Sequence, residues 1–169
     1  MKLPLMNIPS FEEDEILKRL HKDDVMLEFG AGGSTLHFSN YVKKYNSIEH
    51  VGEWATKVKD LAEDNTTVIH APCYYVDNNV HCDYDCLEEK KRWSSYFEAA
   101  KLFEEKYYNK VFIDGRARAY CAIDVLKYID KESIVFIHDY GRTKYHKLVE
   151  TYYNKIHSIG SLAIFRKKD

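Results

Sequence analysis

Short apolar stretches alternate along the chain with stretches in which apolar residues recur every three or four positions. The apolar stretches predict five strands, at residues 25–29, 47–50, 67–70, 110–114 and 133–138. The last of these has no polar alternation, as expected for a strand that is buried on both faces. Residues 156–165 predict two more strands around Gly160, which would form an antiparallel hairpin.

The segments between the strands predict helices. Ser10 and Glu13 have the spacing of a capping box, which places the first helix at residues 11–21. The other helices are expected at 34–43, 52–62 and 94–106, around Cys121 to Ile129, and from Tyr145 to Tyr153.

This alternation predicts an α/β fold with a doubly wound, mostly parallel seven-stranded sheet that ends in a C-terminal antiparallel hairpin. No repeat or linker interrupts the pattern, so residues 1–169 are expected to form one domain, either alone or within a longer polypeptide. Ligands of such sheets bind beyond the carboxyl ends of the strands. The candidate positions are therefore Glu28–Ser34, Glu49–His50, His70–Pro72, Asp114–Arg116 and His138–Arg142.

Composition and charge exclude several classes of protein. The 169 residues are 45% apolar and 31% charged, which excludes a disordered chain, and no apolar run approaches the roughly 20 residues of a membrane span. A net charge of −2 gives no bulk attraction for nucleic acid or anionic lipid, so neither is an expected partner. Four cysteines and an N-terminus unlike a signal peptide indicate a cytoplasmic setting.

The first chemical motif joins the strand at 25–29 to the helix that follows. Its sequence, Glu28-Phe-Gly-Ala-Gly-Gly-Ser34, lets a backbone pass close to a ligand while a helix N-terminus points at an anionic group. The Gly-Lys-Ser/Thr ending of a phosphate-binding P-loop is absent. Thr35 stands where the dinucleotide fingerprint has its third glycine, which disfavours a nicotinamide cofactor and leaves a tight, empty turn as the plain alternative.

The second motif is Glu49, at the end of the second expected strand. An acidic residue about 20 positions beyond the glycines can accept hydrogen bonds from the hydroxyls of a ribose. A solvated or salt-bridged glutamate is the alternative for this position.

The glycine motif, followed by Ser47-Ile-Glu-His50, resembles the first two motifs of class I S-adenosylmethionine-dependent methyltransferases, which have a Rossmann-like sheet. Two further runs, Phe112-Ile-Asp-Gly-Arg-Ala-Arg118 and Phe136-Ile-His-Asp-Tyr140, are similar to small bacterial, algal and large-virus methyltransferase-like proteins. A more distant similarity is to plant glucuronoxylan O-methyltransferases. The resemblance covers about residues 24–168.

The resemblance implies S-adenosylmethionine as the cofactor and a role for each matching residue. Its methionine part would contact Glu28 and the loop formed by Gly30, Ala31, Gly32, Gly33 and Ser34, and Asp114 is a further candidate for cofactor binding. Glu49 would hold the ribose, and His50 with the turn at Ala71 and Pro72 would flank the adenine. The chain departs from the family after the third strand, where His70-Ala71-Pro72 replaces the acidic residue that often contacts the adenine amine.

Asp114 and Asp139 follow two neighbouring strands, where two carboxylates can share a Mg²⁺ or Mn²⁺ ion. A similar site in catechol O-methyltransferase-like enzymes suggests this pair. Asp114, Asp139 and His138 are also candidates for the base that deprotonates a hydroxyl acceptor, with Arg116 as a substrate contact. The alternatives are that Asp114 caps a helix, that His138 is bonded within the sheet, and that Arg116, Arg118 and Arg142 form surface ion pairs.

The irregular stretch at 73–92 is expected to be a substrate lid or a surface excursion. It contains Cys73, His81, Cys82 and Cys86, whose spacing is poor for a zinc site and favours unpaired thiols.

These observations favour an S-adenosylmethionine-dependent O-methyltransferase that acts on a sugar hydroxyl of a glycan, a substrate inferred from the resemblance. The open alternatives are a methyltransferase for a small phenolic or amine acceptor, a dehydrogenase or epimerase, and a non-catalytic scaffold that binds the cofactor.

Overall fold

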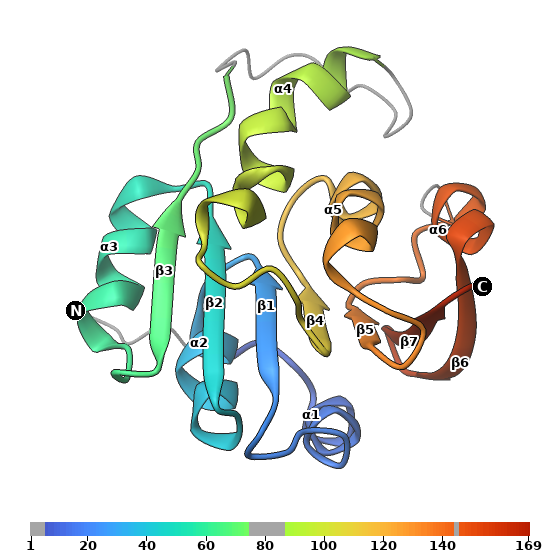
Figure 1. Ribbon diagram of the computed structural model, residues 1–169, viewed down its shortest axis with the longest axis horizontal. Helices are drawn as coiled ribbons and strands as arrows, with labels where there is room; N and C mark the ends of the chain where they lie inside the picture. The colour runs from blue at the N-terminus through green and yellow to red at the C-terminus, as the bar shows by residue number, and fades with distance from the viewer. Residues whose placement is uncertain (1–5, 75–86, 144–145) are drawn as a thin grey trace.

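The computed structural model describes residues 6–74, 87–143 and 146–169, which form a seven-stranded sheet in the order β3-β2-β1-β4-β5-β7-β6 (Figure 1). Neighbouring strands from β3 to β5 are parallel, and β7 pairs antiparallel with both β5 and β6. The sheet confirms the predicted α/β class and the closing hairpin. The strands are β1 Val25–Phe29, β2 Lys44–Glu49, β3 Thr66–His70, β4 Lys110–Ile113, β5 Ile134–Ile137, β6 Tyr153–Ile159 and β7 Leu162–Lys167.

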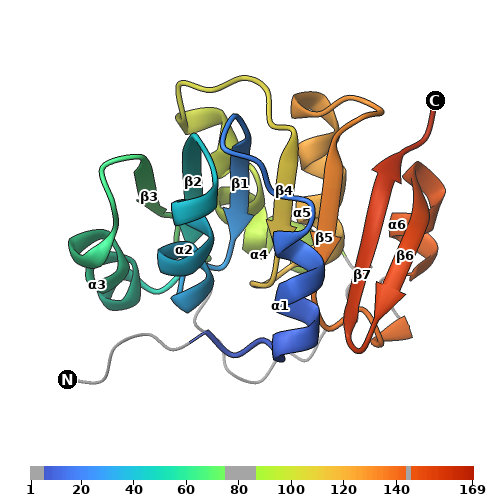
Figure 2. The same cartoon turned by 90° about the horizontal axis from the view of Figure 1, so that it is seen from below.

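Three helices cover each face of the sheet (Figure 2). The helices α1 Ser10–Leu17, α2 Gly33–Phe38 and α3 Gly52–Leu61 lie on one face. The helices α4 Leu87–Phe97, α5 Arg118–Asp124 and α6 His146–Tyr152 lie on the other. None of the helices in the described ranges is long and apolar enough to cross a membrane.

The central strands are buried on both sides because both of their faces carry apolar side chains. Val111 and Ile113 of β4 belong to the large core under α4 to α6, whereas Phe112 between them packs in the core under α1 and α2. The same alternation in β5 places Phe136 on the face covered by α1 and α2, and Val135 and Ile137 on the face covered by α4 to α6. This two-sided burial is typical of parallel sheets and leaves only the ends of the strands open to ligands.

Several element boundaries differ from the sequence prediction. The helix expected at 34–43 ends at Phe38 and continues as a short 3-10 turn at Ser39–Tyr41, because the chain must become extended at Val42 to enter β2. The helix expected at 94–106 spans Leu87–Phe97, and a 3-10 turn at Ala99–Leu102 follows it. Small buried alanines in this turn bring the backbone directly against the core.

The predicted capping box of α1 is wrong. The helix begins at Ser10 with Pro9 at its N-cap, and it has no side-chain cap hydrogen bond. Glu13 instead lies with Oε1 2.8 Å from Nε2 of His37, so its carboxylate joins α1 to α2. The helix also stops at Leu17, four residues short of the predicted end.

Candidate active site

A cavity of about 570 Å³ lies at the carboxyl ends of β1, β2 and β4, as the sheet topology predicts. Its walls are the glycine loop after β1, the residues from Glu49 to Val51 after β2, and Asp114 to Arg116 after β4. Trp54 from α3, the N-terminal residues Met6 to Ile8, Arg118 and Arg142 complete the lining. This volume suits a ligand the size of a nucleoside conjugated to an amino acid.

The glycine loop is held in one conformation by the elements around it. Gly30 has φ +104°, and its N–H donates to the carbonyl oxygen of Ile48 at 2.8 Å. A Cβ at Gly30 would lie 2.7 Å from the Cα and N of Gly115, so the loops after β1 and β4 touch through backbone alone. Trp54 donates from Nε1 to the carbonyl oxygen of Ala31 at 2.6 Å. No feature of the sequence pointed to this role for Trp54.

Glu28 lies beneath the loop and does not line the cavity, so the expected contact with the cofactor is replaced by a structural role. Its carboxylate accepts hydrogen bonds from the hydroxyls of Ser34, Thr35 and Ser47. Thr35 also accepts a hydrogen bond from the N–H of Gly32 at 2.9 Å. In the sequence, Thr35 was notable only because it replaces the third glycine of the dinucleotide fingerprint. In the structure, it connects the glycine loop to the carboxylate of Glu28 beneath it.

Burial raises the pKa of Glu28 to about 7, and the three hydroxyl hydrogen bonds oppose only part of this effect. The folded protein therefore holds this proton more tightly than the unfolded chain does. The contribution of Glu28 to stability is greatest below pH 4.5 and is lost as the pH rises to about 7.

We expect Glu28→Gln to remove this loss, which amounts to about 3 kcal/mol between pH 4.5 and pH 7 in the native protein. Urea denaturation at several pH values measures it, with Glu53→Gln on exposed α3 as the control. A Glu28→Gln protein whose stability has the same pH slope as the native protein would contradict the assignment.

Glu49 is almost fully buried, yet it reaches the cavity. Its Oε1 accepts hydrogen bonds from the N–H groups of His50 and Val51, both at 2.8 Å, and lies 2.8 Å from Nδ1 of His50. These contacts all use Oε1, and within the described chain Oε2 makes none. One carboxylate oxygen is thus fixed by the protein and the other can accept a hydrogen bond from a ligand hydroxyl.

His50 lines the cavity, as predicted, and its ring packs edge-on against Trp93 and Tyr96. Ala71 and Pro72 do not line it. Ala71 is instead tied to the backbone of Glu49, whose carbonyl oxygen accepts its N–H at 2.7 Å. Ala71 therefore supports the site from behind Glu49 without lining the cavity.

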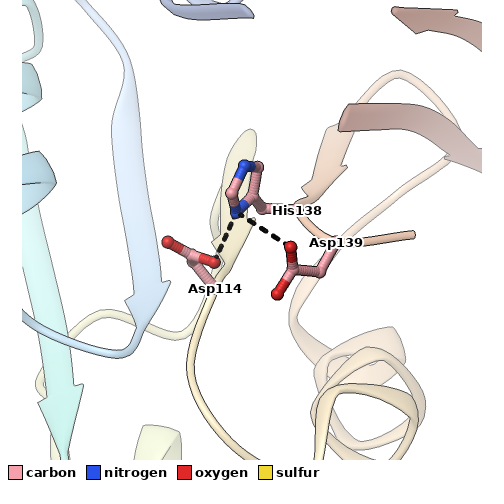
Figure 3. Close-up of side chains that lie close together, drawn as sticks. All are labelled: Asp114, His138 and Asp139. Carbon is pink, nitrogen blue, oxygen red and sulfur yellow. Dashed lines mark hydrogen bonds and ion pairs between the residues drawn. The ribbon is translucent and has the colours of Figure 1, made fainter. Parts of the chain in front are cut away.

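Asp114, His138 and Asp139 meet at the ends of β4 and β5 (Figure 3). His138 lies with Nδ1 2.8 Å from Oδ1 of Asp114 and 4.0 Å from Oδ1 of Asp139. Of the three, only Asp114 lines the cavity. Asp139 has φ +55°, a left-handed conformation that is uncommon outside glycine and often marks functional positions.

The imidazole of His138 lies between two carboxylates. Its Nε2 is 3.0 Å from Oε2 of Glu12, a buried residue of α1 whose Oε1 also accepts the N–H of Ser161 at 2.6 Å. Burial favours the neutral ring, but the hydrogen bond to Asp114 and the negative charges around it outweigh burial and raise the pKa of His138. His138 therefore orients the carboxylate of Asp114 from one side and contacts Glu12 on the other. Sequence reasoning did not find Glu12.

The three arginines near these carboxylates have different environments. Arg118 is buried and lies 3.1 Å from Oδ2 of Asp139 and 3.3 Å from Oδ1 of Asp114. Arg142 is half exposed and lies 2.9 Å from the same oxygen of Asp139. Arg116 lines the cavity, and its side chain makes no hydrogen bond or ion pair within the described residues. Arg118 and Arg142 also line the cavity, but both are engaged with Asp139.

The donor atoms of Asp114, His138 and Asp139 lie within 4.8 Å of one another, a spacing that could hold a divalent cation. Both carboxylates, however, already have a guanidinium partner. The residues therefore do not fit a shared metal ion.

Most of the predicted lid and three of the four candidate zinc ligands, His81, Cys82 and Cys86, lie outside the described residues. Cys73 alone of the four is described, and it is partly buried.

Comparison with solved structures identifies the fold. A methyltransferase-like protein from Silicibacter pomeroyi is 23% identical, with a TM-score of 0.77 over 98% of this chain and 89% of that one. The tRNA (m1A58) methyltransferase from Aquifex aeolicus is 14% identical, with a TM-score of 0.65 over 100% of this chain and 73% of that one. A Streptococcus mutans protein solved in complex with SAH is 12% identical, with a TM-score of 0.61 over 97% and 100% of the two chains.

No protein-family model matches the chain, and no curated protein matches its sequence. The structural likeness shows the class I methyltransferase fold.

Proposed function

From the class I methyltransferase fold as a premise, we propose that this chain transfers the methyl group of S-adenosylmethionine to a sugar hydroxyl of a glycan. One observation carries the proposal. A single cavity is lined by the glycine loop with its positive φ at Gly30, by the carboxylate of Glu49 with one oxygen free, and by Asp114 at the end of β4. The proposal treats residues 1–169 as one domain that contains both the cofactor site and the acceptor site.

The glycine loop and Glu49 are the proposed cofactor site. The backbone from Gly30 to Ser34 would contact the methionine part, and Oε2 of Glu49 would accept a hydrogen bond from the ribose. His50 and Trp54, which also line the cavity, supply flat surfaces for the adenine. The Streptococcus mutans structure supports this assignment because SAH is bound to a protein of the same fold.

The end of β4 is the proposed acceptor side. The bound cofactor supplies an electrophilic methyl group, so the protein has to orient the acceptor oxygen and remove its proton. Asp114 reaches the cavity with one oxygen held by His138, and its Oδ2 has no partner in the described chain. Asp114 can therefore accept the hydroxyl proton, while Arg116 holds a neighbouring oxygen of the acceptor.

A polyhydroxylated acceptor agrees best with the lining. Asp114, Arg116 and Arg142 offer carboxylate and guanidinium groups to hydroxyls, whereas Trp54 is the one aromatic residue among the described lining positions. A phenolic acceptor would be expected to meet more aromatic surface. Some neighbours act on RNA, but the net charge of −2 gives this chain no bulk attraction for a polyanion.

Calorimetric titration of S-adenosylhomocysteine tests the cofactor assignment. We expect the native protein to bind it, Glu49→Gln to bind about 10-fold more weakly because a charge-assisted hydrogen bond is lost, and Glu53→Gln to match the native protein. NAD⁺ should give no heat. Failure of the native protein to bind S-adenosylhomocysteine would overturn the proposed function. With binding established, transfer of a labelled methyl group to a panel of glycans, phenols and amines tests the acceptor class.

A further inference from the structure

We propose that the guanidinium of Arg118 permanently takes the place of a divalent cation between Asp114 and Asp139, so that this site works without a metal ion. The claim that methyl transfer needs no metal ion rests on the proposed function. The claim that Arg118 excludes a divalent cation does not, and it can be tested in the absence of any methyl acceptor.

The position of Arg118 is determined by bonds to the backbone as well as to the carboxylates. Its Nε donates to the carbonyl oxygen of Gly115 at 3.0 Å, its Nη1 donates to that of His138, and its Nη2 donates to that of Asp114 at 3.0 Å. The same Nη2 lies 3.1 Å from Oδ2 of Asp139 and 3.3 Å from Oδ1 of Asp114. Every nitrogen of the guanidinium therefore has an acceptor from the ends of β4 and β5.

Arg118 cannot readily leave this position. Its side chain is 8% exposed, and a guanidinium stays charged at any physiological pH. A rotation that broke these contacts would leave a buried cation without partners, together with the two carboxylates that it now neutralises. Breaking a buried ion pair in this way typically costs several kcal/mol.

A metal ion would have to bind the same two carboxylates, each of which has one oxygen in contact with Arg118. Mg²⁺ or Mn²⁺ binds carboxylate oxygens at roughly 2 Å, so an ion on these oxygens would lie within about 5 Å of the guanidinium. Arg142 adds a second cation at the oxygen of Asp139 that Arg118 already contacts. Asp114 and Asp139 therefore already face two permanently charged guanidinium groups, those of Arg118 and Arg142.

This arrangement gives Arg118 a positioning role. It connects the backbone at the end of β4 to that at the end of β5 and holds both carboxylates in place. A flexible metal-bound water network is thereby replaced by a rigid, planar group. Asp114 remains the carboxylate that the cavity exposes.

Electron paramagnetic resonance of Mn²⁺ titrated into the purified protein tests the proposal. We expect no saturable binding below about 1 mM Mn²⁺ to the native protein or to Arg118→Lys, which keeps the charge. Arg118→Met should bind Mn²⁺ at least about 10-fold more tightly than the native protein, because the cation that competes for the ligand atoms of Asp114, His138 and Asp139 is removed. The double variant Arg118→Met/Asp139→Asn should lose this gain.

Arg142→Met is the matched control, since it removes the other arginine of Asp139 but leaves Arg118 in place, and it should stay free of Mn²⁺. Circular dichroism and thermal denaturation report whether each variant is folded, independently of the proposed function. Saturable Mn²⁺ binding to the native protein that Asp139→Asn abolishes would overturn the proposal, as would a folded Arg118→Met that binds no Mn²⁺. If Arg118→Met does not fold, the native titration decides alone, and absence of binding supports the proposal.

Discussion

Gly30→Ala is expected to abolish binding of S-adenosylhomocysteine and to destabilise the protein by about 3 kcal/mol. The new Cβ would lie 2.7 Å from two backbone atoms of Gly115, and an alanine at φ +104° is strained even where there is space. Neither backbone can move alone, because the N–H groups of Gly30 and Asp114 are bonded to the neighbouring strands β2 and β1. The loop that lines the cavity would have to shift as a whole.

Gly141→Ala provides the control for this change. A Cβ at Gly141 would meet no atom within 4 Å, so stability should change by less than about 0.5 kcal/mol. Thermal denaturation should show a midpoint lower by roughly 6–12 °C for Gly30→Ala only, and calorimetry should show no heat for that variant. Affinity for S-adenosylhomocysteine within twofold of the native value in Gly30→Ala would show that the loop is not the cofactor site.

Asp114→Asn is expected to lower kcat for methyl transfer by at least about 100-fold, the usual effect of removing a general base. The asparagine is of the same size, and its Oδ1 can still accept from His138 and Arg118, so the cluster should keep its geometry. What is lost is the negative charge and the oxygen that takes the proton. Affinity for S-adenosylhomocysteine should stay within a few fold of the native value.

The measurement is single-turnover transfer of a labelled methyl group to the acceptor that the panel identifies, with Asp60→Asn on the exposed side of α3 as the control. A pH profile separates catalysis from structure, because the loss should persist at every pH at which the variant remains folded. Unchanged kcat in Asp114→Asn would remove Asp114 from the chemistry.

The architecture could be predicted because hydrophobic periodicity determines it directly. The strand at Val25–Phe29 was predicted to the residue, since it is short, buried and ended by glycines. From strand order it followed that Glu49 and Asp114 lie at the same edge of the sheet, and both line the cavity. Helix ends were predicted less well, because their position depends on where the next strand must begin, which is a tertiary constraint.

The roles within the site could be predicted only in part. Arg116, Arg118 and Arg142 are equivalent in sequence, yet one lines the cavity without a partner, one is buried between carboxylates and one is half exposed. Glu28 has the residue type of a ligand contact, but three hydroxyls, two from α2 and one from β2, hydrogen-bond to it. These distinctions depend on which side chains meet across the sheet, and local sequence carries no signal for that.

Glu12 connects the two ends of the chain, since its contact with Ser161 joins residues that are 149 positions apart. The same carboxylate contacts His138, which in turn orients Asp114. During synthesis from the N-terminus, α1 and the glycine loop emerge long before the hairpin that contains Ser161. A contact between residues so far apart in sequence forms slowly, because closing the long intervening loop costs conformational entropy. The acidic centre of Glu12, His138 and Asp114 is therefore expected to form later than the glycine loop, because it is completed only when the hairpin of β6 and β7 docks against α1.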